Sequence, residues 1–259
     1  MTGEVSLHLR YAVRSDPGPV RRDNQDAAYA DGQVLALADG MGGHPAGDVA
    51  ASLIVGPFGR RIDAPEWDVV DHLRAATFAG EDAIADYVAK NPETIGMGTT
   101  LTAVRLAGDR LGLLHVGDSR AYLLRDGVLC QLSHDDTLVQ SLVDEGVLSR
   151  DEARVHPQRN VVLRALMGGE TRFSLANFEV RPQDRLLLCS DGLSDVLTHE
   201  QLTEAVRDED VETAAELLVD LALRRGATDN VTCIVADVVV SEGDTAPTFA
   251  GAAARLALR

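Results

Sequence analysis

Residues 99–132 read TTLTAVRLAGDRLGLLHVGDSRAYLLRDGVLCQL, and this stretch decides the fold class. Its apolar and β-branched runs predict four short strands, at Thr99–Leu106, Arg110–Val116, Ala121–Arg125 and Val128–Leu132. Gly108-Asp109 and Asp126-Gly127 supply tight hairpin turns between them. Consecutive hairpins join antiparallel neighbours, so the stretch predicts antiparallel sheet.

Strands and helices flank this hairpin stretch on both sides. The strands expected here are Leu7–Arg14, Ala27–Ala30, Val34–Ala38, Arg185–Cys189 and Asn230–Val240. Helices are expected over about residues 46–60 and 68–90 before the hairpins, and two more over about 200–224 after them. A polar, helix-prone insertion covers about residues 135–167. Paired helices on either side of the hairpins predict an α+β fold whose helices cover the outer faces of the sheets.

The first 240 residues show no repeat and no linker, so they are expected to form one domain, 1–240. Residues 241–259 shift towards small side chains and are expected to form a loose or partly helical C-terminal tail. No stretch has the composition of a signal peptide or a membrane span, which predicts a cytoplasmic protein. A shortened, membrane-tethered relative would look the same.

Acidic residues dominate the charge of the chain. Its 259 residues include 41 Asp and Glu against 24 Lys and Arg, for a formal net charge of −17. That excess argues against nucleic-acid binding, which rewards basic residues. Three widely spaced cysteines, Cys130, Cys189 and Cys233, form neither a disulfide framework nor a zinc knuckle.

Four aspartates stand at the ends of apolar runs. Asp39 follows VLALA, Asp118 follows LGLLHVG, Asp191 follows RLLLCS, and Asp229 precedes Asn230 and the run VTCIVADV. Each one alone fits ordinary turn or helix capping. Together, at one edge of a sandwich, they would form an oxygen-rich cluster suited to Mg²⁺ or Mn²⁺, two of which about 3.5–4 Å apart activate water and bind phosphate. Zinc, EF-hand, P-loop and serine-nucleophile patterns are missing from the sequence.

Six motifs in one order carry a family resemblance. They are VRRDNQD (20–26), LADGMGGHPAG (37–47), GMGTTLTAV (96–104), HVGDSRAYLLRDG (115–127), CSDGLSDVL (189–197) and ATDNVTCIV (227–235). Together they resemble the metal-dependent serine/threonine protein phosphatases of type 2C, in the form of bacterial members that oppose Hanks-type kinases. The resemblance covers about residues 7–240 and implies a four-layer α/β/β/α sandwich. In that fold two central antiparallel sheets carry a dimetal site at one edge, and residues 135–167 form a flap.

The resemblance also implies a ligand set for two core Mn²⁺ or Mg²⁺ ions. Asp39 would bridge the two ions, and Gly40 would offer its backbone carbonyl. Asp191 and Asp229 would complete the protein ligands of the first ion. Asp118, with Asp191, matches the residue that holds a third, weaker ion in bacterial relatives.

Further matches concern the phosphate and the surroundings of the metals. Arg21 matches the phosphate-binding arginine, with Arg22 as the alternative if the register slips by one residue. Gln25 departs from the family, which has Glu at this position to orient metal-bound water, so weaker metal retention is expected. The neighbouring Asp26 is retained. Asn230 is expected beside the metal ligands. His44 is a candidate general acid, with a helix-start role as the alternative.

These assignments predict hydrolysis of phosphoserine and phosphothreonine on proteins by direct attack of a metal-bridged water, without a covalent intermediate. The alternative is a non-catalytic phosphoprotein-binding module with the same fold, which Gln25 alone favours. Expected partners are phosphorylated Ser/Thr proteins, a Hanks-type kinase among them, and the chain is expected to be a monomer. An anti-anti-sigma factor is an equally open substrate.

Overall fold

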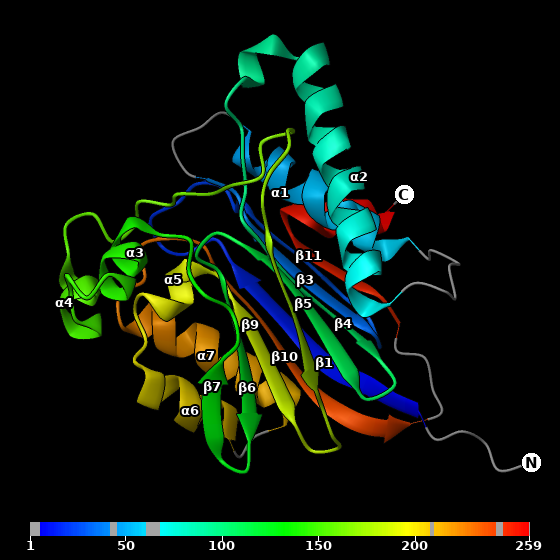
Figure 1. Ribbon diagram of the computed structural model, residues 1–259, viewed down its shortest axis with the longest axis vertical. Coiled ribbons are helices and arrows are strands. Elements are labelled where there is room, and N and C mark those ends of the chain that lie inside the picture. Colours follow the sequence, from blue (N-terminus) through cyan, green and yellow to red (C-terminus); the bar gives the residue numbers. More distant parts are fainter. Residues whose placement is uncertain (1–5, 42–45, 61–67, 208–209, 242–245, 259) are drawn as a thin grey trace, which may run out of the picture.

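The computed structural model describes residues 6–41, 46–60, 68–207, 210–241 and 246–258. With η for 3₁₀ helices, the elements in chain order are β1 (Ser6–Asp16), β2 (Asp26–Ala30), β3 (Val34–Asp39), α1 (Gly47–Val55), η1 (Gly56–Gly59), α2 (Val69–Lys90), η2 (Pro92–Thr94), β4 (Leu101–Ala107), β5 (Arg110–Val116), β6 (Arg120–Arg125), β7 (Val128–Gln131), α3 (Leu138–Asp144), α4 (Arg150–Val155), β8 (Ser174–Glu179), β9 (Arg185–Cys189), α5 (Asp191–Ser194), α6 (His199–Arg207), α7 (Val211–Arg224), β10 (Val231–Ser241), β11 (Thr248–Gly251) and η3 (Ala252–Leu258). Figure 1 shows their arrangement.

Two antiparallel sheets form the centre of the molecule. The five-stranded sheet has the order β1-β10-β9-β6-β7, and the six-stranded sheet has the order β11-β2-β3-β4-β5-β8. The hairpin stretch of residues 99–132 is divided between them, because β4 and β5 pair in one sheet and β6 and β7 in the other. The link from β5 to β6 therefore crosses between the sheets, and it carries Asp118.

Alternating side chains build three separate cores. In β9, Leu186 and Leu188 join the core between the two sheets, whereas Leu187 and Cys189 join the core under the helices of the five-stranded sheet. Successive side chains of a strand point to opposite faces, and both faces are covered, so the strand is apolar throughout. A third core lies under the helices of the six-stranded sheet.

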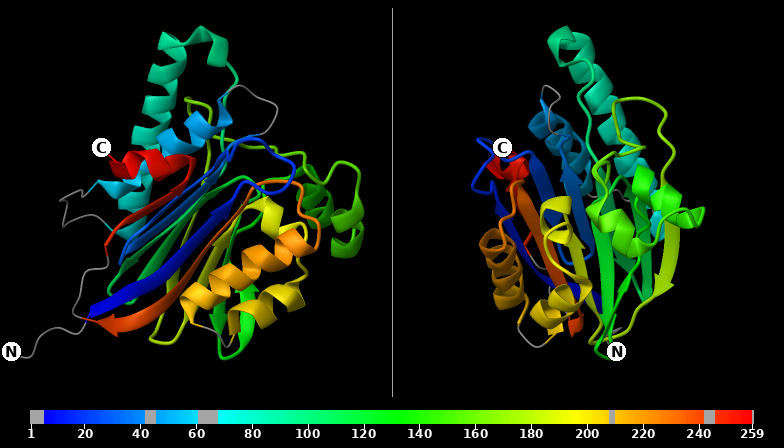
Figure 2. Two further views of the ribbon diagram at one scale, coloured as in Figure 1. Left: turned by 180° about the vertical axis from the view of Figure 1, so that it is seen from behind. Right: turned by 90° about the vertical axis from the view of Figure 1, so that its left-hand side faces the viewer.

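The helices form the two outer layers. α1 and α2 pack on the six-stranded sheet, and α7 packs on β1 and β10 of the five-stranded sheet. Figure 2 shows α6 and α7 on one side of the paired sheets and α2 on the other. The four-layer α/β/β/α sandwich is confirmed. Within the described ranges, no helix is long and apolar enough to cross a membrane.

Several element boundaries differ from the sequence predictions. The helix expected over 46–60 ends as an α-helix at Val55 and continues as η1, because Pro57 lacks the N–H that an α-helix needs there. β4 begins at Leu101, and Thr99 forms only isolated bridges, with Gly40 and with Leu166. Strand β8 and the one-turn helix α5 were not predicted.

The C-terminal segment expected as a loose or partly helical tail is a sheet strand at 248–251, so the expectation was wrong there, whereas residues 252–258 are helical as η3. β11 pairs with β2 at the edge of the six-stranded sheet, where Phe249 packs on Tyr29 with ring centroids 4.8 Å apart. Ala253, in η3, is fully buried in the core under α1 and α2. Small residues suit this edge because they let the chain lie close to β2.

The register of the strands gathers several chain ends at one end of the sandwich. Asp26 at the start of β2 pairs with Asp39 at the end of β3. Cys189 at the end of β9 pairs with Arg120 at the start of β6. The start of β10 lies beside the end of β1. The loops that leave these strands therefore share one end, and all four strand-end aspartates are on them or beside them.

Candidate metal centre

Asp39 is held rigidly by its backbone. Its N–H donates to Thr100 Oγ1 at 3.0 Å, and its carbonyl accepts from Thr99 Oγ1 at 2.9 Å and from Thr100 N at 2.9 Å. Both threonines are buried. The backbone N–H and C=O of Asp39 are thus both satisfied by Thr99 and Thr100, directly before β4, so the carboxylate is not needed to satisfy them.

Gly40 follows in a crowded position. A Cβ there would lie 2.3 Å from Gly47 O and 2.8 Å from Gln25 O, so only glycine fits between these two backbones. Gly40 N donates to Gln25 O at 3.2 Å. The side-chain oxygen of Gln25 lies against Gly47, 3.1 Å from where a Cβ would stand. The residue that departs from the family pattern is therefore packed between Gly40 and the first residue of α1.

Asp191 and Asp118 approach the same end from the five-stranded sheet side. Asp191 begins α5 directly after β9, and Gly192 allows this turn to touch β10, since a Cβ there would lie 2.0 Å from Asn230 O. Asp118 lies in the crossing between the sheets. Its neighbours are fixed: Gly117 N donates to Asp136 Oδ2 at 3.2 Å, and Arg120 forms an ion pair with Asp135 at 2.6 Å.

Asp229 stands at the mouth of the centre, paired with a cation. Arg21 Nη2 lies 2.6 Å from Asp229 Oδ2, with both side chains more than one third exposed. The hydrogen bond to Asp229 raises the pKa of Arg21 further above its usual range. Asn230 ties the same region together, since it accepts from Gln25 N at 2.9 Å and donates to the carbonyls of Pro17 and Asp23.

Asp26 is fully buried behind Asp39. Ser190 Oγ donates to Asp26 Oδ2 at 2.8 Å, and Thr232 N donates to Ser190 Oγ at 3.0 Å. This chain of bonds joins β2 of one sheet to β9 and β10 of the other. Ser190 flanks Asp191, but nothing in its sequence position indicated that it would bond to a residue in β2.

The carboxylates interact strongly with one another. Burial, and then repulsion from Asp26, Asp191 and Asp118, hold the pKa of Asp39 well above its usual range. Burial, and then repulsion from Asp118, Asp195 and Asp229, do the same to the pKa of Asp191. Burial, with repulsion from Asp135 and Asp195, raises the pKa of Asp118 to about 7. Asp195, which sequence reasoning did not single out, is thus part of this charge cluster.

The donor set fits hard divalent cations. It is all oxygen, and Asp191 Oδ1 and Asp26 Oδ1 are buried without a hydrogen-bond partner among the described residues. No group of three His, Cys, Asp or Glu side chains in that part of the chain is spaced as a ready-made ligand set around one point. Asp229 Oδ2 is instead paired with Arg21 at 2.6 Å. Asp39 and Asp191 are buried next to further carboxylates, and positive charge at this place would relieve their mutual repulsion.

A groove leads away from this centre. Its volume is about 460 Å³, and it reaches from Asp118 and Asp191 past Asp195 to α4 of the flap and to α6. The flap is fastened beside it by Asp136, which accepts from Gly117 N and forms an ion pair with Arg164 at 2.9 Å. A groove of this size, open to solvent and ending at the aspartates, has room for several residues of a peptide.

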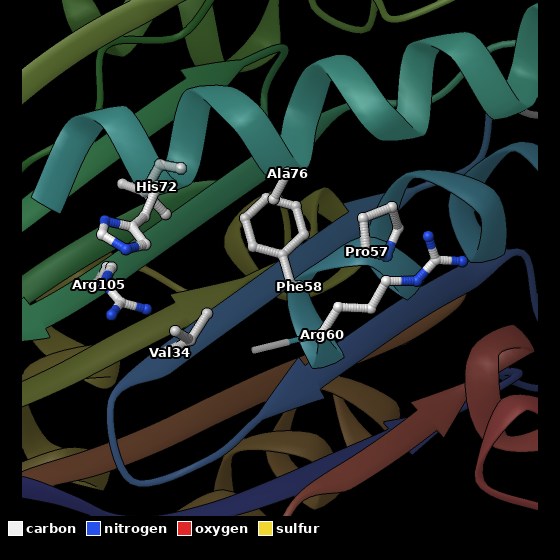
Figure 3. Close-up of a pocket in the computed structure, with 8 residues that line it drawn as sticks. Val34, Pro57, Phe58, Arg60, His72, Ala76 and Arg105 are labelled. Carbon is white, nitrogen blue, oxygen red and sulfur yellow. The ribbon is translucent and has the colours of Figure 1, made fainter. Parts of the chain in front are cut away.

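A second hollow is much smaller and lies elsewhere. Figure 3 shows it between α2 and β3, with Phe58 at its centre and His72 and Arg105 on one side. Its volume is about 20 Å³, enough for a single water. Val34, which lines it, begins the strand that Asp39 ends, so the hollow is at the opposite end of β3.

Of the predicted site residues, Asp39, Gly40, Asp118, Asp191 and Asp229 are brought to one end of the sandwich. Arg21, Gln25, Asp26 and Asn230 lie there too, in direct contact with one another or with those aspartates. His44 lies outside the described residues. Arg22 is exposed and makes no recorded hydrogen bond or ion pair within the described structure.

The fold and this end of it define a four-layer sandwich protein with an all-oxygen acidic centre. Residues 18–239 match the family model described as protein phosphatase 2C. The chain therefore belongs to the protein phosphatase 2C family.

Individual relatives agree with this family. The serine/threonine protein phosphatase PstP of Mycobacterium tuberculosis is 53% identical over 250 residues, which cover 96% of this chain and 49% of the relative. This chain thus spans about half the length of that protein. The serine/threonine phosphatase stp of Listeria monocytogenes is 34% identical, with 89% of this chain and 96% of the relative covered.

Solved structures show the same fold. A crystal structure of the Mycobacterium tuberculosis phosphatase PstP/Ppp superimposes with a TM-score of 0.86 at 52% identity, covering 90% of this chain and 99% of the other. The catalytic domain of PstP in complex with two manganese ions gives a TM-score of 0.84 at 51% identity, covering 90% and 100%.

Proposed function

We propose that this chain hydrolyses phosphoserine and phosphothreonine on proteins with Mn²⁺ or Mg²⁺ as cofactor. The observation that carries the proposal is the convergence of Asp39, Asp118 and Asp191 at one end of the sandwich, with Arg21 beside Asp229 at its mouth. The names of the relatives and the two manganese ions in the PstP complex support the same activity.

Two such ions would be held by the carboxylates of Asp39, Asp191 and Asp229 and by the backbone carbonyl of Gly40. Asp118 and Asp191 would hold a third, weaker ion. When bound, such ions supply positive charge that lowers the pKa of a water and neutralises phosphoryl oxygens. Burial and then mutual repulsion raise the pKa values of Asp39 and Asp191, and bound cations would offset both effects.

The residues around the metal ligands would bind the phosphorylated substrate and hold the surrounding loops in place. Arg21 is exposed enough to present its guanidinium fork to a phosphoryl group, which it can bind through two parallel hydrogen bonds. Asn230 and Gln25 keep the loop that carries Arg21 against the start of β10. The 460 Å³ groove would take the peptide on either side of the phosphorylated residue.

Direct hydrolysis agrees with the state of the cysteine beside the centre. Cys189 is fully buried, and burial raises the pKa of its thiol to about 12, so no thiolate nucleophile forms there near neutral pH. We further propose that the substrates include a Hanks-type kinase, and that the catalytic unit works as a monomer in the cytoplasm. His44 is retained as a candidate general acid.

The test is a manganese titration of Asp39→Asn against a phosphothreonine peptide. Loss of the Asp39 carboxylate is expected to lower turnover about 100-fold or more at saturating metal, since several kcal/mol of charge stabilisation is lost. Asp109→Asn, in the exposed β4–β5 turn, removes one charge far from the centre and is expected to behave as wild type. Unchanged turnover of Asp39→Asn would refute the ligand set, and phosphopeptide binding without any hydrolysis by the wild type would favour a non-catalytic binding module.

A further inference from the structure

Glu81 is a buried carboxylate outside the metal centre. It lies on α2 and is only 5% exposed. Its Oε2 accepts from Gly168 N at 2.6 Å and from Gly169 N at 3.3 Å, whereas its Oε1 is buried without a hydrogen-bond partner among the described residues. A carboxylate buried with one oxygen unpaired is costly, and its neighbours on α2, Thr77, Gly80 and Ile84, are themselves buried. The cost of burying this carboxylate indicates that Glu81 does more than fill space in the core.

Gly168, which donates to Glu81, can reach α2 only because it is a glycine. Gly168 has φ +81°, which non-glycine residues rarely adopt, and a Cβ there would lie 2.7 Å from Ala85 N. Only glycine lets this loop lie directly on α2. Glu81 and Gly168 thus form a latch, by which we mean the contact that fastens the C-terminal end of the flap to α2.

The latch continues to the metal centre through a short series of backbone bonds. Leu166, two residues before Gly168, exchanges two hydrogen bonds with Thr99, of 2.8 Å and 3.0 Å. Thr99 in turn donates its hydroxyl to Asp39 O at 2.9 Å and forms a bridge with Gly40. Glu81, Leu166 and Thr99 are fully or nearly fully buried, so water does not compete for these bonds.

The other end of the flap is fastened differently. Asp136 binds Gly117 and Arg164 there, beside Asp118. This end also leads to Asp39, because Ser119, directly after Asp118, bonds to Thr100 Oγ1, which accepts from Asp39 N. The latch end differs in that it reaches the carbonyl of Asp39 through Leu166 and Thr99.

We propose that Glu81 is a positioning residue, which fixes the end of the flap on α2 and, through Leu166 and Thr99, holds the Asp39-Gly40 backbone in its metal-binding position. The inference rests on the proposed function in that Asp39 and Gly40 are taken as metal ligands. It assigns Glu81 no contact with substrate or metal. Glu81 would determine how closely the backbone of Asp39 and Gly40 is held in its metal-binding position before metal binds.

The experiment measures Mn²⁺ affinity by calorimetry and amide hydrogen exchange at Thr99, Leu166 and Gly168, neither of which needs turnover. Glu81→Ala is expected to weaken Mn²⁺ binding about tenfold, in the range found when groups that orient metal ligands are removed. It is also expected to speed exchange at all three amides. Glu81→Gln keeps an acceptor for Gly168 N and is expected to recover most of both properties. Asp82→Asn, at the exposed neighbouring position on α2, is the matched control and is expected to match wild type.

Glu81→Leu covers the case in which the alanine variant fails to fold. Leucine fills the space that alanine leaves empty, so it avoids the cost of a cavity, although the amides of Gly168 and Gly169 still lose their acceptor. We expect this variant to melt at a higher temperature than the alanine variant yet to share the defects in exchange and Mn²⁺ affinity. A folded alanine or leucine variant with wild-type Mn²⁺ affinity would overturn the proposal and leave Glu81 a purely structural residue. Absence of phosphatase activity in the wild type would instead refute the proposed function and leave these binding data interpretable.

Discussion

The guanidinium of Arg21 lies 2.6 Å from the carboxylate of Asp229, although the two are 208 residues apart in the chain. The pair joins the loop after β1 to the loop before β10, and Asn230 reinforces the same junction through Pro17 and Asp23. Arg21 is thereby kept at the mouth of the acidic centre, where a phosphoryl group would arrive.

Replacing Arg21 distinguishes a phosphate-binding arginine from a solvated one. A charge-assisted hydrogen bond contributes about 1.5–3 kcal/mol, so Arg21→Ala is expected to lower kcat/KM for a phosphothreonine peptide by about 10- to 100-fold. Arg21→Lys keeps the charge without the two-pronged geometry and should fall in between. Arg22→Ala, at the exposed neighbouring position, is the matched control, and a larger loss there would move the phosphate-binding role to Arg22.

Gln25→Glu should strengthen metal binding. Gln25 packs between Gly40 and Gly47 with its side-chain oxygen near α1, so a glutamate at this position adds a negative charge beside the ligands without changing the size of the side chain. We expect Mn²⁺ affinity to rise about tenfold by calorimetry. Gln33→Glu, in the exposed β2–β3 turn, adds the same charge elsewhere. Equal affinities for the two variants would show that net charge, and not position, determines the gain.

Much of this arrangement could be predicted from the sequence because the signals are local. Asp39, Asp118 and Asp191 each end an apolar run, and a strand must end where its apolar alternation does. The hairpin turns at Gly108 and Asp126 identify antiparallel neighbours in the same way. The class of fold and the candidate aspartates follow from such signals without knowledge of long-range contacts, whereas the roles proposed for these aspartates as metal ligands come from the family resemblance.

Long-range contacts explain what the sequence did not reveal. Nothing local shows that β4 and β5 belong to one sheet and β6 and β7 to the other, because strand order is set by packing of the whole core. Glu81 and Gly168 are 87 residues apart, and a single glutamate in an amphipathic helix normally faces solvent. β8 is an exposed edge strand, so its weak apolar pattern gave no clear signal.

The acidic centre predicts an unusual dependence of stability on pH in EDTA. Burial raises the pKa of Asp26 to about 6, and burial and repulsion raise that of Asp118 to about 7, against about 3.9 for an unfolded aspartate. A raised folded-state pKa means that the folded protein binds protons more tightly than the unfolded chain. The contribution of these groups to stability is therefore highest near pH 4 and is lost as pH rises through about 6 to 7.

The measurement is a series of thermal melts in EDTA and in Mn²⁺ between about pH 5 and about pH 8. In EDTA the contribution of the aspartates should lower the melting temperature as pH rises, whereas Mn²⁺ should stabilise more at higher pH, because metal competes with protons for the carboxylates. Asp118→Asn should flatten the EDTA trend. An EDTA profile that Asp118→Asn leaves unchanged would contradict the assigned cause.

Ser190→Ala should destabilise the protein by about 1–3 kcal/mol, although serine is small and the change leaves little space. Ser190 Oγ donates to Asp26 Oδ2 and accepts from Thr232 N, so alanine leaves two buried polar groups without this partner. Asp26 already has one buried oxygen without a partner among the described residues, so loss of Ser190 should raise the pKa of Asp26 further and shift the EDTA stability profile towards higher pH. Urea unfolding measures the free energy, and Ser174→Ala on exposed β8 is the matched control. A Ser190→Ala variant as stable as that control would mean that the bond between the sheets contributes nothing to holding the centre together.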